Sequence, residues 1–233
     1  MRRIDIDRAW LESTWFIDKD APEVGRFARA NTSSSDAPLA QAIGLFSAVR
    51  DQIRYDPYGI SYAPEAFRAS TVASSASNWC VPKSVLLAAA ARSIGIPARL
   101  GFADVRNHLT SEKLLATMGT DLFAWHGYAE LLLPDPAGPE DTLRWFKLST
   151  AFNIELCDRF GVQPLEFDGS DDALMHAYDQ AGNRHMEYVN QRGSFDDLPL
   201  EQILSDFASI YGHEFGQPGP AGSAEAAGDD AFS

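Results

Sequence analysis

Basic residues and long apolar runs are both scarce in this sequence. The chain of 233 residues has 19 Lys and Arg against 33 Asp and Glu, which gives a formal net charge of −14. Because phosphate binding needs clustered cationic side chains, this balance argues against a nucleic-acid partner, and an anionic membrane surface would repel the chain. No stretch approaches the roughly 18 consecutive apolar residues of a membrane-spanning helix. We therefore expect no nucleic-acid partner and no membrane association.

Cysteine is scarce as well, with only Cys80 and Cys157 in the chain. Arg2 and Arg3 are not followed by an apolar segment, so the N-terminus does not resemble a secretory signal. In the reducing cytosol thiols are kept free. The sequence therefore predicts a cytoplasmic protein with two free thiols rather than a disulfide.

The remaining composition is typical of one globular domain followed by a tail. Hydrophobic residues make up 45% and charged residues 22% of the chain, which are ordinary values. From residue 216 onward, Gly, Pro, Ala, Ser and acidic residues predominate. Such a segment has too little apolar surface to offset the entropy lost on ordering. We expect a single domain over residues 1–215 and a disordered tail over residues 216–233.

The spacing of apolar residues predicts a fold of the α+β class. Helices are expected over residues 37–54, 80–94 and 153–160, and around Leu200–Ile210. Strands are expected over residues 98–105, 123–133 and 144–151, the last two forming a hairpin. The segment before residue 37 is mixed in character, and residues 164–197 are expected to be irregular.

The strongest chemical signal is a cysteine at a helix start followed by a histidine on a strand. Cys80 opens the predicted helix 80–94, whose N-terminal N–H groups favour a thiolate and could stabilise an oxyanion. His126 lies inside an otherwise apolar predicted strand. Free cysteine is often a small buried hydrophobe, and a lone histidine in a strand is often structural. Their order along the chain is nevertheless the one that Cys–His enzymes use, with Cys80 as nucleophile and His126 as base.

Three segments carry a resemblance to a known family. They are Asn78-Trp79-Cys80-Val81-Pro82-Lys83, Ser93-Ile94-Gly95-Ile96-Pro97-Ala98-Arg99 and Trp125-His126-Gly127-Tyr128-Ala129-Glu130. Together they resemble the bacterial transglutaminase-like family, and the likeness extends from Val49 to Val189. The resemblance implies a papain-like fold, in which a central helix bearing the nucleophile packs on an antiparallel sheet carrying the histidine, with additional flanking helices.

The sequence departs from this family at the third member of the catalytic triad. The family usually has an aspartate on the strand after the histidine, where this chain has Ser149. Ser149 itself, or Asn153 in the manner of papain's asparagine, could take that role. The third candidate, Asp104, ends a strand that should neighbour the His126 strand, and a carboxylate there could orient the imidazole. The sequence thus predicts Cys80, His126 and Asp104 as catalytic residues, although Asp104 could also be a turn residue.

Other candidate residues are expected to have smaller roles. Trp79 lies beside the nucleophile and could line the acyl pocket, assist the oxyanion site or simply pack. Glu130 is expected to be structural and Cys157 to be a core thiol. The Asp and His residues between positions 168 and 185 lack the spacing of a metal motif and are expected to form a solvated loop. We expect neither a metal nor a cofactor.

The resemblance implies cysteine-dependent acyl transfer through a Cys80 acyl-enzyme on an amide or thioester substrate. Water as the second nucleophile would make the protein an amidase or protease, and an amine would make it a transferase. A carbanion within the acyl chain would make it a Dieckmann-type cyclase that releases a polyketide–peptide from a carrier protein. Similar cyclases have the residue order Cys, Asp, His, which matches Cys80, Asp104 and His126. The expected partner is a small-molecule or carrier-bound acyl substrate. A non-catalytic binding module that has kept the fold is the remaining alternative, because Ser149 replaces the aspartate.

Overall fold

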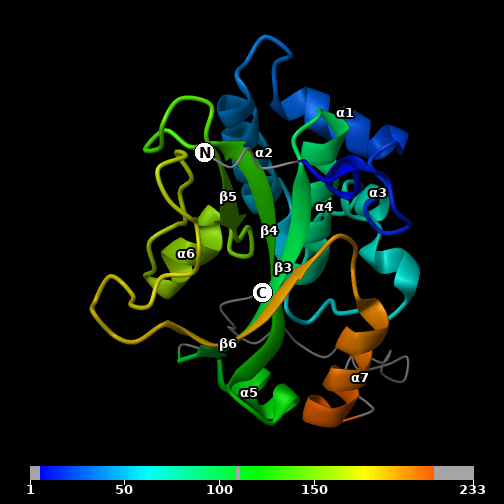
Figure 1. Ribbon diagram of the computed structural model, residues 1–233. Coiled ribbons are helices and arrows are strands. Elements are labelled where there is room, and N and C mark those ends of the chain that lie inside the picture. The colour runs from blue at the N-terminus through cyan, green and yellow to red at the C-terminus, as the bar shows by residue number, and fades with distance from the viewer. Residues whose placement is uncertain (1–5, 109–110, 213–233) are drawn as a thin grey trace.

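A four-stranded antiparallel sheet forms the centre of the computed structural model, which describes residues 6–108 and 111–212 (Figure 1). The strand order is β5-β4-β3-β6. The strands are β3 (Ala98–Asn107), β4 (Leu122–Pro134), β5 (Leu143–Leu148) and β6 (Met186–Phe195). The predicted α+β class is confirmed, and so is the hairpin of β4 with β5.

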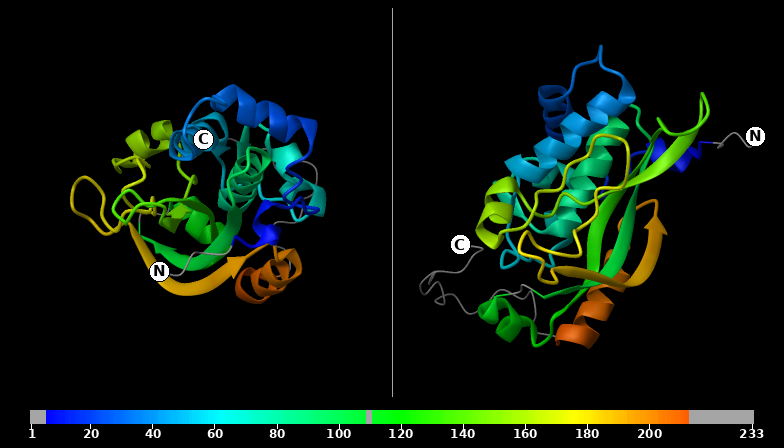
Figure 2. Two further views of the ribbon diagram at one scale, coloured as in Figure 1. Left: turned by 45° about the horizontal axis from the view of Figure 1, so that its top comes forward. Right: turned by 90° about the vertical axis from the view of Figure 1, so that its left-hand side faces the viewer.

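Helix α4 (Cys80–Ser93) packs against β3 and β4 and is enclosed by other helices on its remaining sides (Figure 2). Its neighbours are α1 (Pro22–Asn31), α2 (Pro38–Gln52) and α3 (Ala69–Val72). Every residue from Cys80 to Arg92 is buried. This burial explains why the helix is apolar on nearly every side, since no face of it meets water.

Two short helices, α5 (Glu112–Met118) and α7 (Leu200–Tyr211), lie at the end of the sheet where β3 ends and β4 begins (Figure 1). The other elements are η1 (Arg8–Leu11), η2 (Pro64–Phe67), α6 (Ile154–Phe160) and a parallel pair of β1 (Arg54–Tyr55) with β2 (Ser77–Asn78). None of the helices in the described part of the chain is both long and apolar enough to cross a bilayer.

The structure corrects the sequence-based expectation at several elements. Helices α1, α3 and α5 were not predicted, β5 ends at Leu148 rather than at residue 151, and β6 lies within the segment 164–197 that was expected to be irregular. Strand β6 is an edge strand whose residues are mostly half-buried or exposed, so its sequence lacks a clear apolar alternation. The predicted tail over residues 216–233, and with it the end of the predicted domain at residue 215, lies outside the described residues.

A buried lysine connects three parts of this fold next to the first turn of α4. Lys83 is fully buried, and its Nζ donates to the backbone oxygens of Arg50 (3.0 Å), Ile53 (2.5 Å) and Ala151 (3.0 Å). These three acceptors match the three N–H donors of a protonated amine, although burial lowers the pKa of Lys83 to about 7. The contacts join the C-terminal end of α2 and the segment after β5 to the first turn of α4.

Candidate active site

Cys80 lies in the first turn of α4 and faces a pocket at the end of the sheet. It is 7% exposed, and both it and His126 line this pocket. Gly127, the residue after His126, approaches the same turn so closely that a Cβ there would lie 3.0 Å from the Val81 Cα. The absence of a side chain at Gly127 therefore lets β4 pack directly against the start of α4.

The Cys80 sulfur is buried among backbone N–H donors. Burial raises the pKa of the Cys80 thiol to about 11, and hydrogen bonds from the backbone N–H groups of Gly127, Val81 and Cys80 itself oppose this rise. We had expected the helix N-terminus to favour a thiolate. The N–H groups act in that direction, but removal of the sulfur from water outweighs them. The resting cysteine is therefore a neutral thiol at neutral pH.

His126 is buried on β4 and is also neutral. Its Nε2 lies 3.3 Å from the Ser149 Oγ, and burial lowers its pKa to about 4. When Nε2 carries the ring proton and donates it to Ser149, Nδ1 keeps a free lone pair. An imidazole in this state is unprotonated at neutral pH, so its Nδ1 is available to accept a proton, but the lowered pKa makes it a weaker base than a solvated histidine.

Ser149 is thus the side chain that contacts the imidazole, and the predicted hydrogen bond from His126 to Asp104 is not formed. The side chain of Asn153, the other alternative, accepts instead from the Tyr55 N–H at 3.1 Å. Asp104 lies opposite a β-bulge in β4. Ala103 pairs with His126 and Val105 pairs with Phe123, so Ala124 and Trp125 together face Asp104.

The bulge places Trp125 in an unusual conformation directly before His126. Trp125 has φ = 58°, in the left-handed region that a bulky residue rarely adopts. Its backbone N–H donates to Asp104 Oδ1 at 3.1 Å, and its indole Nε1 donates to Asp206 Oδ2 on α7 at 2.9 Å. Asp104 thus contacts the strand beside the histidine rather than the imidazole.

Asp104 is itself fixed by residues of β6. Arg192 Nε donates to Oδ1 at 2.8 Å and Asn190 Nδ2 donates to Oδ2 at 3.2 Å. Burial acts to raise the pKa of Asp104, but the hydrogen bonds from Arg192, the Trp125 N–H and Asn190 outweigh it, so the pKa is lowered. Arg192 also pairs with Asp206 at 2.5 Å. This ionised network connects β3, β6 and α7 around Trp125.

The remaining predicted residues lie as follows. Trp79 is buried, lines the pocket and packs edge-on against Phe67, with centroids 5.8 Å apart. Glu130 accepts from Arg99 at 2.5 Å and from Ser194 at 3.0 Å, which is a structural role. Cys157 is buried in the hydrophobic core, and both cysteines are free thiols. Within residues 6–108 and 111–212, no group of three or more His, Cys, Asp or Glu could hold a metal ion.

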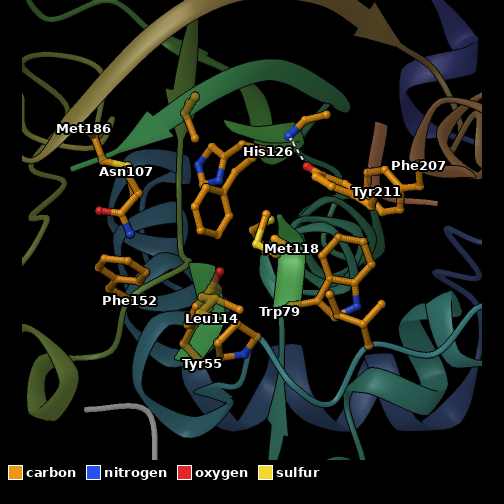
Figure 3. Close-up of a pocket in the computed structure, with 16 residues that line it drawn as sticks. Tyr55, Trp79, Asn107, Leu114, Met118, His126, Phe152, Met186, Phe207 and Tyr211 are labelled. Carbon is orange, nitrogen blue, oxygen red and sulfur yellow. Dashed lines mark hydrogen bonds between the residues drawn. The ribbon is translucent and has the colours of Figure 1, made fainter. Parts of the chain in front are cut away.

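The pocket beside Cys80 is formed by side chains from both layers of the fold (Figure 3). In Figure 3 His126 lies between Phe207 and Tyr211 on one side and Asn107 and Phe152 on the other. The lining residues are Tyr55, Pro57, Ile60, Trp79, Cys80, Val105, Asn107, Leu114, Met118, Phe123, Ala124, His126, Phe152, Met186, Phe207 and Tyr211. A substrate carbonyl in this pocket would therefore lie next to the sulfur and the imidazole.

A family model of the transglutaminase-like superfamily matches residues 25–150, which is more than half of the chain. The chain belongs to the transglutaminase-like superfamily. This membership confirms the resemblance seen in the sequence and supports a cysteine-dependent enzyme. The matched region contains Cys80, His126 and Ser149.

Comparison with other proteins adds little beyond this superfamily. No curated protein matches the chain. A solved structure described as a candidate cysteine protease from Cytophaga hutchinsonii is similar, with a TM-score of 0.45 and 13% sequence identity. The similarity covers 84% of this chain and 59% of that one.

Three residues of the site were missed by reasoning from the sequence. Trp125 and Arg192 hold the bulge, and Lys83 anchors the first turn of α4. Only Lys83 gave a usable signal, because it is one of just two charged residues, with Arg92, in a helix that is otherwise apolar on nearly every side. The conformation of Trp125 and the pairing of Arg192 depend on β6, which the sequence did not reveal.

The neutral state of both groups predicts how Cys80 reacts with iodoacetamide. Burial raises the pKa of Cys157 to about 11 as well, so thiolate content does not favour either cysteine. At about pH 6 an imidazole with a pKa of about 4 is already a free base. We expect Cys80 to alkylate at least about tenfold faster than Cys157, and His126→Ala to abolish the difference. Peptide mass spectrometry gives both rates in one sample, and equal rates in the wild-type protein would contradict a Cys80–His126 pair.

Proposed function

We propose that the protein is an acyl-transfer enzyme in which Cys80 is the nucleophile and His126 the general base. The observation that supports this most directly is the position of both residues in one pocket, at the point where Gly127 packs against the first turn of α4. The neutral imidazole takes the thiol proton as sulfur attacks the acyl carbonyl, and an acyl-enzyme forms. The three N–H donors around the sulfur stabilise negative charge as the proton leaves.

His126 then returns the proton to the leaving group. For a thioester substrate, the S–C bond of the substrate breaks, a new thioester to Cys80 forms, and the departing thiolate takes the proton from the imidazolium. A second nucleophile next attacks the acyl-enzyme and restores the Cys80 thiol. With water the overall reaction is hydrolysis, and with an amine it is transfer. The partner that we propose is a small-molecule or carrier-bound acyl group.

The cyclase alternative has lost its main support. It was favoured because the order Cys80, Asp104, His126 matches that of certain cyclases, but Asp104 bonds to the Trp125 N–H and not to His126. We propose instead that Asp104 is a positioning residue. It holds a strained residue in place next to the base, and a misplacement of about 1 Å can cost roughly 10²-fold in rate.

Turnover of a simple acyl thioester tests the proposed function. We expect the full chain to release free thiol from the N-acetylcysteamine thioester of hexanoic acid. Cys80→Ala should lower the rate at least about 10³-fold and His126→Ala about 10²- to 10⁴-fold, because the first variant lacks the nucleophile and the second lacks the base that act in the transition state. Cys157→Ala is the matched control and should stay within about twofold of the wild type. Chromatography measures both products, and turnover that survives Cys80→Ala would contradict the proposal.

The pH profile of Cys80 acylation separates the roles of Ser149 and Asp104. Ser149→Asp places a carboxylate beside the imidazole, so it should raise the pKa of His126. The acid limb of the profile, where the acylation rate falls at low pH, should then move upward by roughly 1–3 pH units. Ser149→Asn, with the same size and no charge, should leave the limb near its wild-type position. Asp104→Asn should lower the rate about tenfold and leave the limb unchanged, since this side chain does not touch the imidazole.

The opposite pattern would assign the triad differently. If Asp104→Asn lowered the acylation rate about 10⁴-fold and moved the acid limb to lower pH, Asp104 would behave as a carboxylate that orients the histidine directly. Single-turnover rates between about pH 3.5 and pH 8 give both quantities, and circular dichroism checks the fold of each variant.

A further inference from the structure

The pocket beside Cys80 has walls that are almost entirely apolar. Beyond Cys80 and His126, polar side-chain atoms come only from Tyr55, Trp79, Asn107 and Tyr211 among its described lining residues, and none of the lining residues is Asp, Glu, Lys or Arg. The hydroxyl of Tyr211 accepts from the Ala124 N–H at 2.6 Å and donates to the Leu122 oxygen at 3.0 Å. This hydroxyl is therefore bound to β4, and the ring of Tyr211 contributes apolar surface.

Such walls discriminate between acyl groups by desolvation. A carboxylate or ammonium that enters the pocket gives up its hydration without an oppositely charged partner, which is strongly unfavourable. An amide group, as in a glutamine side chain, also loses hydrogen bonds to water. An aliphatic chain instead gains from every apolar contact, at up to about fourfold in binding for each buried methylene.

Two helices beyond the sheet contribute further apolar surface to this pocket. Leu114 and Met118 come from α5 and Phe207 from α7, and all three are buried. Met118 and Met186 are unbranched, and their flexible thioethers adapt to ligands of different shape. We propose that this pocket binds the acyl part of the substrate as an uncharged aliphatic chain that is presented to Cys80 as a thioester. The inference rests on the proposed acyl-transfer function and specifies its substrate class.

A matched pair of thioesters tests this specificity. The hexanoyl and adipoyl monothioesters of N-acetylcysteamine have acyl chains of the same length and differ by a terminal carboxylate. We expect hexanoyl to acylate Cys80 at least about a hundredfold faster than adipoyl and about ten- to a hundredfold faster than acetyl. Intact-protein mass spectrometry measures all three single-turnover rates. Equal rates for hexanoyl and adipoyl would overturn the inference.

A charge placed in the wall should weaken the preference for hexanoyl over adipoyl. Met118→Lys puts an ammonium in the pocket at the C-terminal end of α5, where a cation is tolerated by the helix. The ratio of hexanoyl to adipoyl acylation should fall at least about tenfold. Leu115→Lys is the matched control, because Leu115 is 41% exposed on the same helix and is not among the lining residues, and its ratio should equal that of the wild type. A ratio that Met118→Lys leaves unchanged would contradict the assignment of this wall.

Binding to an inactive variant separates this inference from the proposed function. Calorimetry with Cys80→Ala and the hexanoyl and adipoyl amides of cysteamine measures binding to the pocket without any acylation. Preferential hexanoyl binding without any acylation of the wild-type protein would support the pocket and reject the function. Acylation that shows no chain preference, with no preferential binding, would keep the function and reject the pocket.

Discussion

The contact between Gly127 and the first turn of α4 determines the geometry of the whole site. A Cβ at Gly127 would lie 3.0 Å from the Val81 Cα, so a larger residue would push β4 and the helix apart by a few tenths of an ångström. The approach lets the Gly127 N–H oppose the rise in the Cys80 pKa that burial causes, and it brings His126 to the pocket that Cys80 lines. It also encloses both groups, and this burial keeps the thiol and the imidazole neutral. The proposed reaction therefore begins with proton transfer from thiol to imidazole during attack, rather than with attack by a preformed ion pair.

The strand that carries the base is held by charges on its other side. Trp125 adopts φ = 58° one residue before His126, a conformation that persists only where the surroundings enforce it. Asp104 binds its N–H, Asp206 binds its indole, and Arg192 pairs with both carboxylates. A carboxylate is thus retained near the histidine, but as support for the backbone, while the neutral Ser149 contacts the imidazole. A neutral serine beside the imidazole leaves the lowering of the His126 pKa by burial unopposed.

The sequence predicted those features that depend on local pattern. Apolar residues on nearly every side of the predicted helix indicated that α4 is central. The boundary between this helix and the loop before it placed Cys80 at the helix start. The partner of Asp104 could not be predicted, because it depends on a bulge opposite that residue and on β6, whose half-exposed residues show no clear alternation. The neutral state of Cys80 could not be predicted either. The helix N-terminus is visible in the sequence, whereas the burial that outweighs it arises from the packing of β4 and of the pocket walls.

The central claim is that the acyl group is transferred to Cys80, and the most direct measurement is the site of the covalent adduct. The full chain is incubated with the hexanoyl thioester, quenched in acid, digested and mapped by mass spectrometry. The account predicts the hexanoyl mass on the peptide containing Cys80, none on the peptide containing Cys157, and no adduct at either position in Cys80→Ala. A hexanoyl group on Cys157, or consumption of the thioester with no cysteine adduct at any time point, would contradict it.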